Sequence, residues 1–204
     1  MVMVERAPRW TLIKILPYLL LVAGIIGVFC SGMLTYEKIS LLKHPASPLS
    51  CDLNPIVACG PVINKPQASA FGFPNPFIGL VGFSVVATIG AAMLAGATFK
   101  RWFWLGLQAG TVFGVGFITW LQFQSIFRIA ALCPYCMVVW AITIPIFWYT
   151  LLYNLREGHI KLPKKYAKIG AFLQRHHADL LVVWYLAIIG VILHHFWYYW
   201  STLF

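Results

Sequence analysis

The sequence predicts an all-α integral membrane protein whose chain crosses the bilayer five times. Of its 204 residues, 61% are hydrophobic and 10% are charged, whereas a soluble domain carries about 25% charged residues. Five long stretches contain no Asp, Glu, Lys or Arg, and each exceeds the about 20 residues that a helix needs to span a membrane. The alternating segments typical of a membrane barrel are absent. The composition therefore excludes a soluble globular protein and a disordered tail.

The expected spans cover residues 12–36, 76–99, 102–125, 131–154 and 179–201. The first span has basic flanks but no small-residue cleavage site, so we expect it to be retained rather than removed as a signal peptide. In the third span Gly106, Gly110 and Gly114 recur every fourth residue, which predicts close approach of a neighbouring helix. We expect residues 1–204 to form a single membrane domain.

The positive charges predict the orientation of these spans. The chain carries 15 Lys and Arg residues, and most of them lie in the N-terminal segment and in the loops after the second and fourth spans. Because short loops rich in Lys and Arg stay cytoplasmic, we expect a multi-pass protein of the cell membrane with a cytoplasmic N-terminus and an extracytoplasmic C-terminus. The net charge of +10 then faces the anionic lipid of the bilayer rather than nucleic acid.

Two cysteine pairs fall on the extracytoplasmic side of this topology. Cys51 and Cys59 lie in the proline-rich loop 37–75, which is too long for a passive connection and which we expect to form a cap. Cys133 and Cys136 form a Cys-x-x-Cys motif where the fourth span begins, and a helix N-terminus favours the thiolate. Two dithiols on an oxidising face can pass electrons by thiol–disulfide exchange. Static disulfides, or half of a zinc site at Cys133 and Cys136, are the alternatives.

Electrons from such a relay need an acceptor. The sequence contains no Gly-rich nucleotide loop and no evident haem or iron–sulfur ligand set, and the abundant two-electron acceptor within lipid is a quinone. Aromatic residues near the cysteines, among them Phe77, Tyr135 and Trp140, could wall a flat apolar pocket. Asn75, between two prolines where the second span begins, either caps that helix or donates to a quinone oxygen.

The ordered set of these residues resembles the vitamin K epoxide reductase family, in its bacterial, thiol-oxidising (DsbB-like) branch. The pieces that match are Cys51-Asp52 and Cys59 in the loop, Phe71-Gly72, Asn75 followed by Gly79, and the Cys133–Cys136 motif. The resemblance implies a four-helix bundle around a quinone, either menaquinone or ubiquinone, with a fifth helix and a cap formed by the cysteine loop.

The resemblance also implies a role for each matching residue. Cys51 would meet the thiol partner, Cys59 would exchange with Cys133, and Cys136 would face the quinone. Asn75 would hydrogen-bond the quinone, and Asp52 would order the loop. Because the chain ends just beyond the fifth span and carries no fused thioredoxin-like domain, we expect the electron donor to be a separate DsbA-like or thioredoxin-fold protein.

The sequence departs from the family pattern at two positions. Trp140 stands where relatives often have Tyr, and its indole N–H can donate but not accept a hydrogen bond. Lys65 stands where Ser or Thr is usual.

Three other functions compete with thiol oxidation. They are reduction of a vitamin K epoxide by the same cysteines, a DsbB-type design, in which the order of the cysteine pairs is reversed, and metal binding by four thiolates. We expect no metal.

Overall fold

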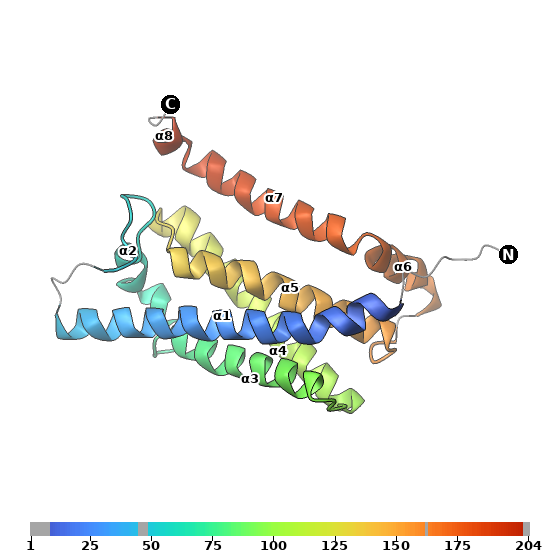
Figure 1. Cartoon of the computed structure of the whole chain (residues 1–204). Helices are drawn as coiled ribbons and strands as arrows, with labels where there is room; N and C mark the ends of the chain where they lie inside the picture. Colours follow the sequence, from blue (N-terminus) through green and yellow to red (C-terminus); the bar gives the residue numbers. More distant parts are fainter. Residues whose placement is uncertain (1–8, 45–48, 162, 202–204) are drawn as a thin grey trace.

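The computed structural model describes residues 9–44, 49–161 and 163–201, and it confirms an all-α membrane protein. Five long helices, α1 (Arg9–Lys43), α3 (Pro76–Leu94), α4 (Arg101–Phe123), α5 (Pro134–Arg156) and α7 (His177–His195), dominate the molecule (Figure 1). Each contributes a segment long and apolar enough to cross a membrane. Shorter elements connect them: α2 (Gly60–Ile63), η1 (Pro66–Ser69), η2 (Gln124–Ile129), η3 (Lys164–Tyr166), α6 (Ala167–Arg175) and α8 (Trp197–Trp200).

The first helix is longer than we predicted. We placed the end of the first span at residue 36 and a loop over 37–75, but α1 continues to Lys43. The additional residues are helical because they pack against the cysteine loop. Glu37 is buried and accepts a hydrogen bond from the Ser50 N–H (3.2 Å), and Lys38 Nζ donates to the Ile63 carbonyl (3.0 Å).

The other helix ends differ from the predicted boundaries for local reasons. The second span ends at Leu94 rather than 99, because Gly96 takes a left-handed conformation (φ 89°) that stops the helix. The third span continues through the π-helix η2 to Ile129. The fourth begins at Pro134 rather than 131, and the fifth ends at His195 rather than 201 before the short helix α8.

Helices α1, α3, α4 and α5 form a bundle in which α1 packs against α3 and α5, and α4 packs against α5. The contact between α1 and α3 depends on glycine, since a Cβ atom on Gly24 would lie 2.6 Å from the backbone nitrogen of Ala87. One core cluster includes Leu16 and Leu20 of α1, Phe83 of α3 and Trp104 of α4. These contacts leave one large cavity, described below, between the four helices.

Helix α7 lies to one side of the bundle and diverges from α5 along much of its length (Figure 1). None of its described side chains is buried. It is held at both ends, because Trp148 Nε1 donates to the His177 carbonyl (3.0 Å) and Phe196, at the junction with α8, is fully buried. In its middle, the Tyr185 hydroxyl donates to the Ala141 carbonyl of α5. A fifth helix beside a four-helix bundle is the arrangement that we predicted.

Candidate functional site: two cysteine pairs beside a membrane cavity

The four paired cysteines meet at one end of the bundle. Cys51 and Cys59 form a disulfide, and the Sγ atom of Cys133 lies 3.1 Å from the Sγ atom of Cys59. Cys136 follows one helical turn after Cys133, and both are free thiols. Three sulfur atoms in this arrangement can exchange a disulfide, because attack by a thiolate on a disulfide sulfur requires such direct approach.

Backbone hydrogen bonds hold the two cysteine segments together. The Ala58 N–H donates to the Leu132 carbonyl (2.9 Å), and the Leu132 N–H donates to the Ile56 carbonyl (2.8 Å). These bonds involve the residues immediately before Cys59 and Cys133, so they fix the backbone that carries the two sulfur atoms. The contact between Cys59 and Cys133 is thus built into the fold of the loop.

Asp52 ties together the two ends of the disulfide-closed segment. Its Oδ1 atom accepts hydrogen bonds from the N–H groups of Cys59 (2.7 Å) and Gly60 (3.0 Å). A carboxylate that accepts two backbone N–H groups makes charge-assisted bonds, which are roughly twice as strong as neutral ones. The loop-ordering role that the family resemblance implies for Asp52 stays a prediction, and these two bonds are the contacts through which it would act.

Hydrogen bonds to the sulfur favour the thiolate of Cys133. Cys133 is the N-cap of α5, just outside the span that begins at Pro134, and its sulfur accepts a hydrogen bond from the Cys136 N–H (3.4 Å). Hydrogen bonding from the Cys136 thiol is the largest effect and lowers the pKa of Cys133; the backbone N–H groups of Cys136 and Tyr135 add to it, while burial opposes it. The Cys133 thiol therefore ionises more readily than an ordinary thiol, and a thiol of lower pKa is the better leaving group in thiol–disulfide exchange.

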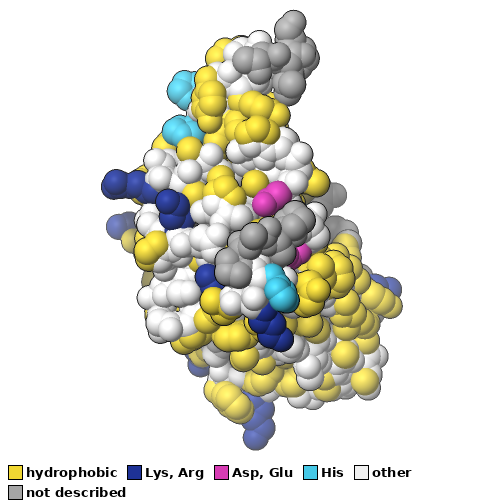
Figure 2. Space-filling view, turned by 90° about the vertical axis from the view of Figure 1, so that its left-hand side faces the viewer, with side chains coloured by type: hydrophobic (Ala, Val, Ile, Leu, Met, Phe, Trp, Pro, Cys, Tyr) yellow, Lys and Arg dark blue, Asp and Glu magenta, His cyan; other side chains and the backbone are white. Residues whose placement is uncertain are grey.

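The sulfur atoms of the exchange centre are shielded from water. Cys59 and Cys133 are fully buried, and Cys51 is only 4% exposed. Leu34 and Ile63 pack around them. Figure 2 views the molecule from the end that carries the cysteine loop, where basic, acidic and histidine side chains are scattered among hydrophobic ones.

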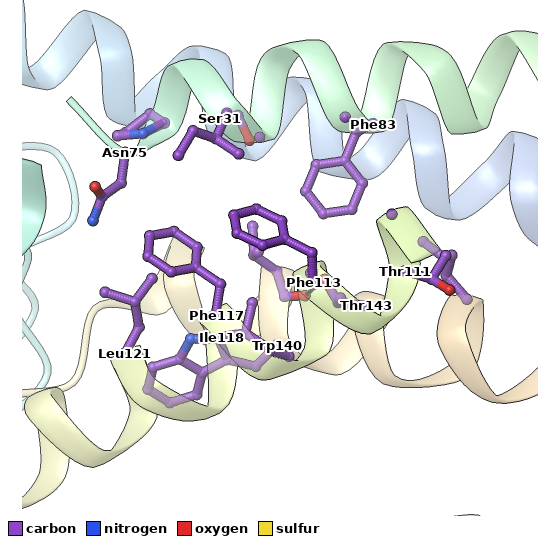
Figure 3. Close-up of a pocket in the computed structure, with 18 of the residues that line it drawn as sticks. Ser31, Asn75, Phe83, Thr111, Phe113, Phe117, Ile118, Leu121, Trp140 and Thr143 are labelled. Carbon is purple, nitrogen blue, oxygen red and sulfur yellow. Dashed lines mark hydrogen bonds between the residues drawn. The ribbon is translucent and has the colours of Figure 1, made fainter. Parts of the chain in front are cut away.

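A cavity of about 550 Å³ extends from Cys136 between α1, α3, α4 and α5. Its walls are mainly apolar, and Figure 3 shows Phe113, Phe117 and Leu121 of α4 opposite Phe83 of α3. Its volume lies in the range of small-molecule sites, and apolar walls with a few polar groups are typical of such sites. An apolar ligand bound in the cavity would therefore lie next to Cys136, one thiol of the Cys133–Cys136 pair.

The family model of the vitamin K epoxide reductase family matches residues 18–151, more than half of the chain. The chain belongs to the vitamin K epoxide reductase family. No curated protein matches it. Membership makes the protein a quinone-linked thiol oxidoreductase of the membrane, which agrees with cysteine pairs that adjoin an apolar cavity. In the described part of the chain, no group of three or more His, Cys, Asp or Glu side chains is placed to hold a metal ion.

The structure separates the residues that we predicted to bind quinone into two groups. Asn75 and Trp140 line the cavity and face it from opposite sides (Figure 3). Phe77 and Tyr135 do not line it: Phe77 is 40% exposed on α3, and Tyr135 packs beside the cysteines. The prediction for these two residues was based on nearness in sequence, and neither residue lies on the cavity wall.

The side chain of Asn75 does not cap α3, although the sequence allowed this. Its Oδ1 atom accepts a hydrogen bond from the Ala70 N–H (2.9 Å), and its Nδ2 atom donates to the Gln67 carbonyl (2.7 Å). Asn75 thus fixes the η1 segment against the start of α3. The second N–H of the Asn75 amide takes part in neither of these two bonds.

Helix α4 supplies a cavity wall that we did not predict. Phe113 and Phe117 are four residues apart and stack with their rings 5.8 Å apart, and Phe71 packs against Phe117 (5.5 Å). The prediction that Gly106, Gly110 and Gly114 allow close helix packing was wrong at Gly106 and Gly110, where nothing lies within 4 Å of a Cβ atom, while a Cβ atom at Gly114 would lie 3.5 Å from Thr143 of α5, an ordinary contact. Gly106 and Gly110 line the cavity instead. The four-residue spacing of the aromatic residues and of the glycines on α4 was the sequence signal that could have predicted this cavity wall.

Proposed function

We propose that this protein reoxidises a separate DsbA-like or thioredoxin-fold protein outside the cytoplasm and passes the electrons to a membrane quinone. The observation that carries the proposal is the sulfur–sulfur distance of 3.1 Å between Cys59 and Cys133, next to a disulfide on one side and a cavity on the other. The chain then supports disulfide bond formation in its partner's substrates.

The relay begins at Cys51. A thiolate of the reduced partner attacks the Cys51 sulfur, which forms a mixed disulfide and releases Cys59 as a thiolate. The second thiol of the partner then attacks its own sulfur in the mixed disulfide, so that the partner leaves oxidised and Cys51 is left reduced. The pair Cys51 and Cys59 now carries the two electrons.

The second exchange moves the electrons toward the cavity. The Cys59 thiolate attacks Cys133 in the Cys133–Cys136 disulfide and releases Cys136 as a thiolate. Cys51 next attacks Cys59, which restores the Cys51–Cys59 disulfide and leaves Cys133 and Cys136 reduced, the arrangement of the structure. A quinone bound in the cavity accepts two electrons and two protons, and the Cys133–Cys136 disulfide re-forms. Each step of about 30 mV in potential contributes about 1.4 kcal/mol for two electrons.

The cavity suits a quinone such as menaquinone or ubiquinone because its walls are mainly apolar and carry a few polar side chains, Asn75 among them. We assign Asn75 and Trp140 to quinone binding, since both face the cavity (Figure 3). An indole N–H and the remaining amide N–H are donors that a quinone carbonyl accepts.

This function requires the cysteine end of the bundle to face the outside of the cell. Lys100 and Arg101 at the start of α4, and Lys161, Lys165 and Lys168 after α5, lie at the other end. Basic residues mark the cytoplasmic side, so we place the N-terminus in the cytoplasm and the paired cysteines outside it. Epoxide reduction by the same cysteines would use the same topology.

The test is quinone reduction by the full-length protein in nanodiscs with a reduced DsbA-like donor. We expect turnover by the wild type, none by Cys136→Ser or Cys59→Ser, and a mixed disulfide between Cys51 and the donor in Cys59→Ser. Cys30→Ser, which changes a cysteine outside both pairs, is the matched control and retains turnover. Inactivity of the wild type with both ubiquinone and menaquinone, or turnover only with a vitamin K epoxide, would refute the proposal.

A further inference from the structure

One buried oxygen atom in the cavity wall has no hydrogen-bond donor. Gln67, in η1, lines the cavity, and its side-chain Oε1 atom is buried without a partner among the described residues. A buried polar atom without a partner destabilises a protein, and nearly all such atoms are satisfied in native structures. The few exceptions therefore need an explanation, and a ligand in the cavity would provide one once the Gln67 side chain turns its oxygen atom toward the ligand.

The backbone around Gln67 is fixed by Asn75. The Gln67 carbonyl accepts the hydrogen bond from Asn75 Nδ2 (2.7 Å), and the Ala70 N–H donates to Asn75 Oδ1 (2.9 Å). Gln67 thus lies at the same end of the cavity as Asn75, and its unpaired oxygen is not the result of a loose loop. The Asn75 oxygen, by contrast, already has a donor.

The proposed quinone reaction creates the donor that this oxygen lacks. A quinone offers only acceptors, whereas the quinol formed from it by two electrons and two protons carries two hydroxyl groups, which are donors. The Trp140 indole on the cavity wall has an N–H and cannot accept a hydroxyl proton. We propose that Gln67 Oε1 accepts a hydrogen bond from a quinol hydroxyl, so that Gln67 binds the reduced product more tightly than the oxidised substrate; this inference rests on the proposed function.

The test compares the affinities of the two redox forms. Full-length protein in nanodiscs, carrying Cys136→Ser so that no electrons are exchanged, is titrated without oxygen with a short-chain ubiquinone, followed by quenching of tryptophan fluorescence. The corresponding quinol is then measured by its displacement of the quinone. The variants are Gln67→Met, which keeps the size but removes the oxygen, and Gln67→Glu, which keeps an acceptor. Gln174→Met on α6, outside the cavity, is the matched control.

We expect Gln67→Met to weaken quinol binding by about three- to tenfold, the loss of one hydrogen bond, and to change quinone binding less than twofold. This shift equals a decrease of about 15 to 30 mV in the midpoint potential of the bound quinone. Gln67→Glu restores the preference for quinol, and Gln174→Met leaves it unchanged. Equal effects of Gln67→Met on both forms, or no effect on quinol, would overturn the inference.

A second measurement separates ligand binding from a structural role. If the Gln67 oxygen has no partner in the ligand-free protein, its removal costs no hydrogen bond, so Gln67→Met should unfold at the same temperature as the wild type or higher. A clear decrease in unfolding temperature without ligand would show that Gln67 stabilises the fold and would contradict the inference. Failure of the Cys136→Ser protein to bind any quinone would instead refute the proposed function, and this inference with it.

Discussion

Replacing Glu37 tests how the cysteine loop is held closed over Cys133. Glu37 lies at the end of α1 with 4% of its surface exposed, and its Oε1 atom accepts hydrogen bonds from both the N–H and the hydroxyl of Ser50. Ser50 immediately precedes Cys51, which is itself nearly buried. Attack on Cys51 by an external thiol therefore requires the loop to open, and opening breaks these two bonds.

The two bonds set the expected size of the effect. A hydrogen bond to a charged group contributes about 1.5 to 3 kcal/mol, but Ser50 is exposed and water satisfies its donors after opening, so we expect about 2 to 3 kcal/mol for both bonds together. Glu37→Leu then increases the open population by about 30- to 150-fold. Glu37→Gln keeps an acceptor at about half the strength, so its effect is about five- to twelvefold.

The assay is the rate at which dithiothreitol reduces the Cys51–Cys59 disulfide of the protein in nanodiscs, measured by alkylation and mass spectrometry. When opening and closing are fast, this rate follows the open population. The control is Glu157→Leu. Glu157 is exposed and lies at the end of α5 that is remote from Cys133, so this variant should be reduced at the same rate as the wild type. Equal rates for Glu37→Leu and the wild type would show that these bonds do not control access to Cys51.

Three further predictions concern the loop, the exchange thiol and the bundle. Asp52→Ala removes two charge-assisted bonds to backbone N–H groups and should decrease stability by about 2 to 4 kcal/mol, measured by thermal unfolding, whereas an unchanged midpoint would contradict the role of Asp52. Because Cys136 lowers the pKa of Cys133, Cys136→Ala should move the Cys133 titration, followed by its ¹³Cβ shift, to higher pH; a move to lower pH would refute this account. Gly24→Ala should cost about 1 to 3 kcal/mol because its Cβ meets the α3 backbone at 2.6 Å, while Gly32→Ala, with nothing within 4 Å, should not.

The features that the sequence predicted are those set by local composition. Runs without charged residues placed the five spans, and the spacing of Cys133 and Cys136 placed a thiol at a helix start. The rotation of each helix about its axis could not be predicted in the same way, because α3 and α5 are apolar on all sides and carry no amphipathic pattern. The sequence therefore did not show that Phe77 and Tyr135 lie off the cavity wall.

Tertiary contacts account for the remaining differences. Residues 37–43 were predicted as loop because Glu37 and Lys38 are charged, yet both are bonded to the cysteine loop, which extends the helix. Asn75 was predicted to cap α3 or to bind quinone; its side chain does not cap α3 but bonds to η1, eight residues earlier at Gln67, while its role at the quinone stays a prediction. No local pattern indicates such partners, since they depend on how the loop folds back over the bundle.

The tethers of the cysteine loop differ at its two sulfurs, and this difference explains the order of the proposed relay. Cys59 is tied to the segment that carries Cys133 by the adjacent Ala58–Leu132 hydrogen bond, whereas the neighbours of Cys51 bond elsewhere, Ser50 to Glu37 and Asp52 to the Cys59 N–H. A partner that displaces the loop at Ser50 exposes Cys51 while Cys59 stays against Cys133. Because Cys59 and Cys133 are fully buried, their exchange proceeds at the high effective concentration of an intramolecular step and is closed to other thiols.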